Sequence, residues 1–120
     1  MKKPSEYLAS GYNCAESIIK CYNEDFDKDI PLSIGSSLGG GACVGSLCGA
    51  LNGSLVIIGY EKGRNDNSEM NEARSYAKKF MDIAREKYST FLCRELKANK
   101  VSCAEISDFS YETLLKILEM

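Results

Sequence analysis

The chain of 120 residues has no histidine, although it carries six cysteines and a net charge of only −2. Without histidine there is no Ser-His or Cys-His catalytic pair, no histidine-ligated zinc and no histidine axial ligand for haem. Any metal would have to be held mainly by thiolates, which are typical ligands of zinc and of iron–sulfur clusters. The small net charge gives no electrostatic reason to expect nucleic acid or an anionic membrane as a partner.

The sequence also lacks a secretory signal and closely spaced cysteine pairs. No apolar stretch follows the basic N-terminus, so we expect a cytoplasmic protein whose thiols stay reduced. Six cysteines in that compartment indicate metal or redox chemistry more than a disulfide framework. No two of them have CxxC spacing, which argues against a thioredoxin-type pair and against a zinc ribbon. A cysteine site would therefore have to be assembled from distant segments.

Charged side chains are missing from residues 30–60, and this region holds most of the glycines. Four of those glycines recur at every fourth position: Gly41, Gly45, Gly49 and Gly53. On a helix this spacing predicts a ridge without side chains, which a flat cofactor or the backbone of a second copy of the chain could approach closely. We expect these glycines to bind a cofactor or to form a homodimer contact. Serines interrupt the region, and a bilayer span needs about 20 predominantly apolar residues, so we expect a buried helix and no membrane span.

The remaining segments show apolar stripes with a helical period. These stripes run along residues 14–26, 73–91 and 111–118. No segment shows a useful length of period-two alternation, so no strand is predicted. We expect one all-α domain over residues 1–120, with five or six helices and a Gly-rich helix at its centre.

Two cysteines stand at the start of a predicted helix. Residues 13–16 (Asn-Cys-Ala-Glu) and 102–105 (Ser-Cys-Ala-Glu) each read as a capping box. Unpaired N–H groups and the positive end of the helix dipole stabilise an anion at that position. We therefore expect Cys14 and Cys103 to ionise readily to reactive thiolates. Cys48 is expected in the first turn of the Gly-rich helix, with Ser46 as its N-cap.

An ordered set of segments resembles the C_GCAxxG_C_C family, small redox-active proteins common in anaerobic bacteria and archaea. The segments are Gly11-Tyr12-Asn13-Cys14-Ala15, Gly39-Gly40-Gly41, Cys48-Gly49-Ala50-Leu51-Asn52-Gly53, Cys93-Arg94-Glu95-Leu96 and Cys103. The resemblance carries the family's four-cysteine pattern onto Cys14, Cys48, Cys93 and Cys103. One departure is that glycine follows Cys48 here, whereas the family label places glycine before its central cysteine. The resemblance implies redox activity with a partner protein that it does not identify.

The first functional hypothesis is a thiolate-held metal centre. Cys14, Cys48, Cys93 and Cys103, with Cys43 as an additional candidate, would hold an iron–sulfur cluster, or in second place zinc. Such a centre would serve electron transfer or redox sensing.

Two alternatives need no metal. In the first, the chain is a thiol–disulfide oxidoreductase in which Cys14 or Cys103 attacks and Cys48 or Cys93 resolves. In the second, it is a helical interaction module whose cysteines are small core residues. Cys21, which lies inside an apolar stripe, fits the description of a core residue best.

Overall fold

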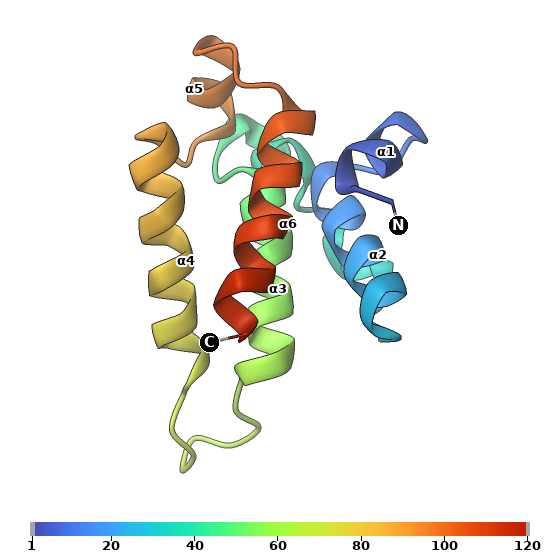
Figure 1. The fold of residues 1–120 in the computed structure, drawn as a ribbon. Helices are drawn as coiled ribbons and strands as arrows, with labels where there is room; N and C mark the ends of the chain where they lie inside the picture. The colour runs from blue at the N-terminus through green and yellow to red at the C-terminus, as the bar shows by residue number, and fades with distance from the viewer. Residues whose placement is uncertain (1, 120) are drawn as a thin grey trace.

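The computed structural model describes residues 2–119, which are predominantly helical (Figure 1). The helices are α1 (Pro4–Ala9), α2 (Cys14–Phe26), α3 (Gly49–Lys62), α4 (Ala73–Tyr88), α5 (Cys93–Ala98) and α6 (Cys103–Glu119). Two short helical turns, η1 (Leu32–Gly35) and η2 (Gly41–Gly45), lie between α2 and α3. Within the described residues the only strand-like pairing is an isolated bridge between Leu47 and Leu92, so the all-α prediction is confirmed.

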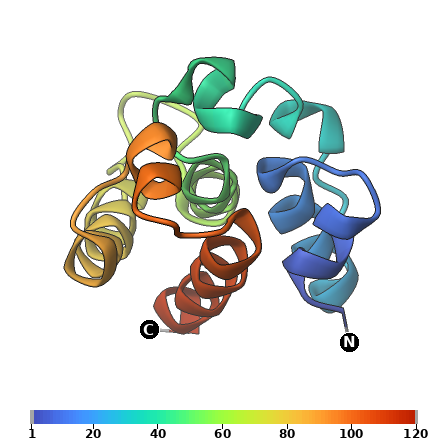
Figure 2. The same cartoon turned by 90° about the horizontal axis from the view of Figure 1, so that it is seen from above.

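Helices α2, α3 and α6 form the centre of the molecule and begin at the same end, the upper end in Figure 1. Helix α3 packs against both α2 and α6, α1 covers α2 and α6, and α4 covers α3 and α6. Figure 2 looks down on that end and shows η2 and α5 there, close to the first turn of α3. The starts of several helices therefore converge on one small region.

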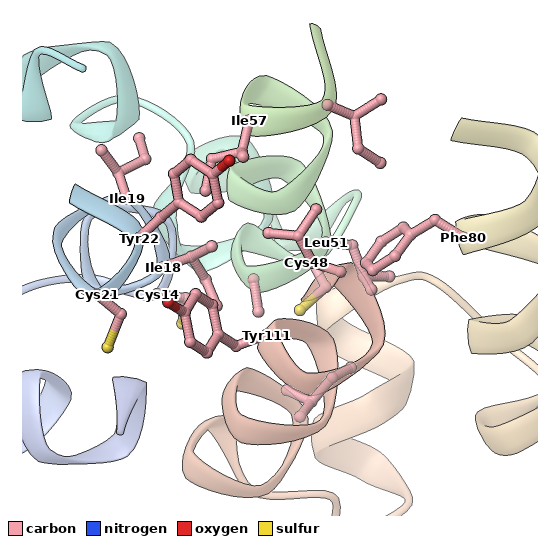
Figure 3. Packing of buried hydrophobic residues seen from close by; sticks show 14 of the residues in the cluster. Cys14, Ile18, Ile19, Cys21, Tyr22, Cys48, Leu51, Ile57, Phe80 and Tyr111 are labelled. Carbon is pink, nitrogen blue, oxygen red and sulfur yellow. The ribbon is translucent and has the colours of Figure 1, made fainter. Parts of the chain in front are cut away.

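The apolar core fills the space between these helices. Ile18, Leu51, Phe80 and Leu114 come from α2, α3, α4 and α6 and are completely buried. Burying a side chain of this size stabilises a fold by about 1.5–3 kcal/mol. Figure 3 shows how Ile18, Leu51 and Phe80, with Cys14 and Cys48, fill the same interior. Within residues 2–119 no helix is both long enough and apolar enough to cross a bilayer.

The predicted Gly-rich helix is wrong in its first half. Gly41 and Gly45 lie in η2 with positive φ values of 67° and 73°, and Ala42 and Cys43 between them are also left-handed. A right-handed helix cannot pass through such residues, so α3 begins only at Gly49. The four glycines consequently do not form one ridge.

The two glycines of this set that lie within α3, Gly49 and Gly53, pack against the same chain. A Cβ atom at Gly53 would lie 2.9 Å from the carbonyl oxygen of Ala15 and 3.2 Å from the Cβ of Ile18. Glycine therefore allows α2 and α3 to approach closely. Because α2 covers this face, it is not free to form the predicted contact with a second copy.

Candidate functional site

Four cysteines, each at the start of a helix, surround one pocket. Cys14, Cys93 and Cys103 are the first residues of α2, α5 and α6, and Cys48 is the N-cap residue of α3. The other residues that line the pocket are Gly49, Leu96, Lys97, Val101 and Ile106. The chain thus brings together the same four cysteines that the sequence pattern singled out. We call this space the thiol pocket.

Helix caps position Cys14 and Cys103. Asn13 Oδ1 accepts from the backbone N–H of Glu16 at 2.8 Å, and Glu16 Oε1 accepts from the backbone N–H of Asn13 at 2.9 Å. This capping box fixes Cys14 as the first residue of α2. At the second site, Ser102 Oγ accepts from the backbone N–H of Glu105 at 3.0 Å.

The cap at Ser102 differs from the cap at Asn13 in what its glutamate carboxylate contacts. Glu105 accepts a hydrogen bond from Tyr88 Oη at 3.1 Å, whereas Glu16 turns back to the N-cap backbone. Tyr88 is the last residue of α4, so this bond ties the end of α4 to the first turn of α6.

A backbone bridge positions the other two cysteines. The N–H of Cys48 donates to the carbonyl of Phe91 at 2.9 Å, and the N–H of Cys93 donates to the carbonyl of Ser46 at 2.7 Å. These bonds hold the segment before α3 against the segment before α5. The bridge also explains why Ser46 is not the N-cap of α3 that the sequence predicted. Ser46 lies in the extended bridge, and the helix begins beyond Cys48.

Glycines provide the space that the cysteines occupy. A Cβ atom at Gly49 would lie 3.0 Å from the Cβ of Cys14, and one at Gly41 would lie 2.7 Å from the Cβ of Cys93. Real Cβ atoms rarely approach other atoms so closely, so a larger residue at either position would displace a cysteine. Cys14 is thus the nearest neighbour at Gly49, whereas at Gly41 the backbone of Ser46, at 2.6 Å, is slightly nearer than Cys93. The interpretation of Gly41, Gly45, Gly49 and Gly53 as cofactor ligands gains no support from this arrangement.

Burial and like charge control the acidity of the buried thiols. Cys14, Cys48 and Cys93 are 9%, 4% and 8% exposed, and Cys103 is partly exposed. Burial raises the pKa of Cys14 to about 12, assisted by the negative charge that Cys103 and Cys48 carry when ionised and by a hydrogen bond to Cys103. The prediction of a readily formed thiolate at Cys14 is therefore wrong, because desolvation outweighs the helix start.

The pKa of Cys48 is raised for the same main reason. Burial is the largest cause, while the N–H groups of Leu51 and Ala50 near its sulfur act in the opposite direction and lower the pKa. Ionised Cys93 and Cys103 raise it further. The pocket thus favours neutral thiols at both Cys14 and Cys48.

The expected metal centre is not preformed in the described residues. Four thiolates are a suitable donor set for zinc or an iron–sulfur cluster. In the described part of the chain, however, no group of three or more histidine, cysteine, aspartate or glutamate side chains is placed to hold a metal ion. The volume of the thiol pocket for water-sized spheres is about 10 Å³, which corresponds to roughly one water molecule. A cluster of several iron and sulfide atoms needs more space.

The two remaining cysteines lie outside the thiol pocket. Cys43 is exposed in η2 and its thiol donates to the carbonyl of Ser37 at 3.6 Å, so its candidacy as an additional ligand is not supported. Cys21 is buried, and its thiol donates to the carbonyl of Lys2 at 3.6 Å. In Figure 3 it points towards α1 and away from Cys48.

The sequence interpretation missed the residues of α5 and the following turn that cover the thiol pocket. Leu96 and Lys97 lie on α5, and Val101 follows it. A usable signal existed, because residues three and four positions after Cys93 share its face of a helix. Lys97 is the one charged residue among those that line this pocket.

The chain matches the C_GCAxxG_C_C family over residues 12–117, and the family is described as "Putative redox-active protein". Comparisons with curated proteins and with solved structures found no match. The matched range contains all four cysteines of the thiol pocket.

Proposed function

We propose that this chain, which belongs to the C_GCAxxG_C_C family, is a metal-free thiol–disulfide protein that cycles between a dithiol and a disulfide. The observation that supports this most directly is that Cys14 and Cys103, from distant parts of the chain, line the same small pocket. They lie close enough for ionised Cys103 to raise the pKa of Cys14, and a disulfide requires such proximity. The family match supports redox activity. The proximity of Cys14 and Cys103 supports exchange between a dithiol and a disulfide as its form.

Exposure assigns different roles to the two thiols. Cys103 is the one member of the thiol pocket that is partly exposed, so it is the sulfur that a partner can reach. Cys14 is buried beside it and is held as a neutral thiol by its raised pKa. Cys103 is therefore the attacking cysteine and Cys14 the resolving cysteine.

The reaction transfers two electrons to a disulfide in a partner protein. The Cys103 thiolate attacks one partner sulfur, forms a mixed disulfide and releases the other partner sulfur as a thiolate, which takes up a proton. Cys14 then attacks Cys103, and the proton of Cys14 passes to the partner sulfur that leaves Cys103. The chain ends with a Cys14–Cys103 disulfide and the partner with two thiols. A dithiol partner reverses the sequence and restores the reduced chain.

The backbone bridge argues against Cys48 and Cys93 as a second disulfide. They occupy diagonal positions across the antiparallel bridge between Leu47 and Leu92. Diagonal neighbours in such a ladder are about 7–8 Å apart. A disulfide needs Cα atoms within roughly 7 Å, so this pair could not be bridged without movement of the backbone. This removes the Cys48–Cys93 pair as an alternative to the proposed Cys14–Cys103 disulfide.

The test uses a small aromatic disulfide whose released thiolate absorbs light. It is done on the reduced Cys43→Ser protein, because exposed Cys43 would otherwise react as well. Two equivalents of thiolate are expected from the Cys43→Ser protein, with no adduct retained. Cys14→Ala added to this background should release one equivalent and stop as a mixed disulfide at Cys103. Cys103→Ala should abolish the fast release, and Cys21→Ala should leave it unchanged.

Release of both equivalents by the Cys103→Ala protein would contradict these roles. The donor set itself favours one rival, an iron–sulfur centre held by the four pocket cysteines. The rival predicts bound iron and sulfide in protein purified without oxygen, and visible absorbance that is lost when any one of these cysteines is replaced. The two functions therefore differ in metal content as well as in the thiolate count.

A further inference from the structure

We propose that residues 94–101, comprising most of α5 and the turn after it, form a lid that must move aside to open the thiol pocket. We call this segment the α5 lid. The proposal rests on the proposed function for its purpose, because the partner sulfur bound to Cys103 and the attacking Cys14 sulfur need room in the pocket. Its physical basis is independent of that function.

The first observation is that the thiol pocket has little free space. Its free volume is about 10 Å³, and Cys14 and Cys48 are almost fully buried. A mixed disulfide at Cys103 adds a partner sulfur and its carbon chain, and Cys14 must then attack the Cys103 sulfur along the S–S axis. The pocket has no room for these atoms, so its wall has to move during the exchange.

The second observation is that the α5 lid forms the outer wall and is weakly attached. Leu96, Lys97 and Val101 line the thiol pocket from this segment. Helix α5 packs chiefly against the η2 turn, whereas α2, α3 and α6 pack extensively against one another. In Figure 1 it lies above the main helices at the end where they begin. Segments with few packing contacts open at lower free energy than the core does.

The third observation concerns the two ends of the segment. The bridge between Leu47 and Leu92 fixes the chain up to Cys93, so movement is confined to the residues after it. At the far end Lys100 has a φ of 65°, a left-handed conformation that costs free energy for a residue with a side chain. Opening that releases Lys100 from this conformation recovers part of its own cost. Lys100 is thus suited to act as the hinge.

The fourth observation is free space on the other side of the lid. A second pocket of about 310 Å³ lies between α5 and the end of α4. Its lining residues are Tyr88, Ser89, Thr90, Glu95, Ala98 and Asn99. Helix α5 therefore separates a nearly filled inner pocket from a large outer one. Rotation of α5 into the outer pocket would widen the inner one without displacing the core helices.

Two cysteines of α2 form a matched pair of probes for this opening. Cys14 and Cys21 are both buried, and the pKa of each is raised to about 12. Each thiol reacts only once it is exposed to solvent, where both are ordinary cysteine thiols, so their intrinsic reactivity towards an alkylating reagent is similar. Only Cys14 lines the thiol pocket, so only its alkylation should respond to the α5 lid.

The experiment measures the alkylation rate of each cysteine in the reduced protein by mass spectrometry, over a series of low urea concentrations. In the absence of urea Cys14 should react about tenfold or more faster than Cys21, and with little dependence on urea, because local opening exposes little surface. Equal rates with equal urea dependence would overturn the proposal, since both thiols would then react only after global unfolding.

Two leucine variants sharpen the test. Leu96→Ala removes a buried side chain from the lid and should raise the Cys14 rate about tenfold while leaving Cys21 unchanged. The control, Leu114→Ala, removes an equally large side chain from the core and should raise both rates together. A rise in the Cys21 rate in Leu96→Ala equal to that of Cys14 would contradict the lid.

If Leu96→Ala does not fold, Val101→Ala and amide hydrogen exchange of the wild type replace it. The amides of Leu96 and Asn99, which donate to Leu92 and Glu95 within the α5 region, should exchange faster than the interior amides of α6. Exchange as slow as that of α6 would overturn the proposal. Alkylation and exchange require no disulfide chemistry, so a failed lid leaves the proposed function standing. Lid opening seen by alkylation or exchange, in a chain that forms no disulfide, would refute only the proposed function.

Discussion

Cys14 and Cys21 lie on the same helix, are similarly buried and have pKa values raised to a similar level, yet their surroundings differ completely. Cys14 is surrounded by three further thiols. Cys21 is surrounded by carboxylates, of which Asp25 acts most strongly on its pKa. Burial and position on a helix therefore do not distinguish the two cysteines. The identity of the neighbouring side chains distinguishes them.

The polar groups around the two cysteines are satisfied in different ways. Near Cys21, Asp25 accepts a hydrogen bond from Tyr111 Oη at 2.5 Å, and Asp108 accepts from Ser5 Oγ at 2.8 Å. Asp25 and Asp108 thus each have a partner, which is typical of a stable structural network. In the thiol pocket, the neighbouring cysteines instead raise the pKa of Cys14 and of Cys48 when they are ionised. Such local conflict is expected at functional sites.

The largest expected effect is stabilisation by oxidation. A disulfide between Cys14 and Cys103 would close a loop containing most of the chain, and loop closure of that size should raise the free energy of unfolding by about 4–5 kcal/mol. Urea unfolding of the oxidised and reduced proteins measures this difference. Cys21→Ala should retain the full gain and Cys14→Ala should lose it. A gain that persists in Cys14→Ala would show that another pair forms the disulfide.

The effect of intermediate size comes from alanine substitutions at two glycines of α3, which test the packing around Cys14. The Cβ of Gly49→Ala would lie 3.0 Å from the Cβ of Cys14, so we expect a loss of about 1–3 kcal/mol in stability and less disulfide at equilibrium. Gly59→Ala meets no atom within 4 Å and should gain up to about 1 kcal/mol through helix propensity. Urea unfolding and alkylation under the same thiol buffer check both variants. Equal behaviour of the two would argue against a tight contact at Cys14.

At neutral pH the smallest effect is a pH dependence that both cysteines share, because it develops only above about pH 9. The folded pKa of each is about 12 against an ordinary value of 9.0, so the unfolded chain loses these protons first. Stability should be complete below about pH 9 and fall towards pH 12, by up to about 1.4 kcal/mol per pH unit for each thiol. The difference in unfolding free energy between wild type and Cys14→Ala, or Cys21→Ala, isolates each contribution. Oxidation should remove the Cys14 contribution and leave that of Cys21, and loss of both on oxidation would contradict the pairing.

Local signals in the sequence predicted the parts of the site that depend on neighbouring residues. The capping box at Asn13, and the one bond of the predicted box that forms at Ser102, correctly place Cys14 and Cys103 at helix starts, because these bonds span three residues. The order of the four cysteines, recognised through the family resemblance, predicts the set that lines the thiol pocket. These features require no knowledge of the tertiary structure.

Other features depend on the tertiary structure and were not predictable. Period-four glycines fit a helix, but glycine also tolerates positive φ, and η2 takes that second conformation at Gly41 and Gly45. The acidity of Cys14 depends on burial by segments far away in sequence, which reverses the effect expected from the helix start. The juxtaposition of Cys14 with Cys103, and the cover that Leu96 provides, likewise arise only on folding.

The most direct test is a disulfide map of the full chain after equilibration, without oxygen, in a buffer of thiol and disulfide at a series of ratios. Free thiols are alkylated, the protein is digested and the linked peptides are identified by mass spectrometry. The account predicts one reversible link, between the peptides that contain Cys14 and Cys103, while Cys21, Cys48 and Cys93 remain alkylated. Protection of all four pocket cysteines by bound iron or zinc, or a reversible link that excludes Cys14, would contradict it.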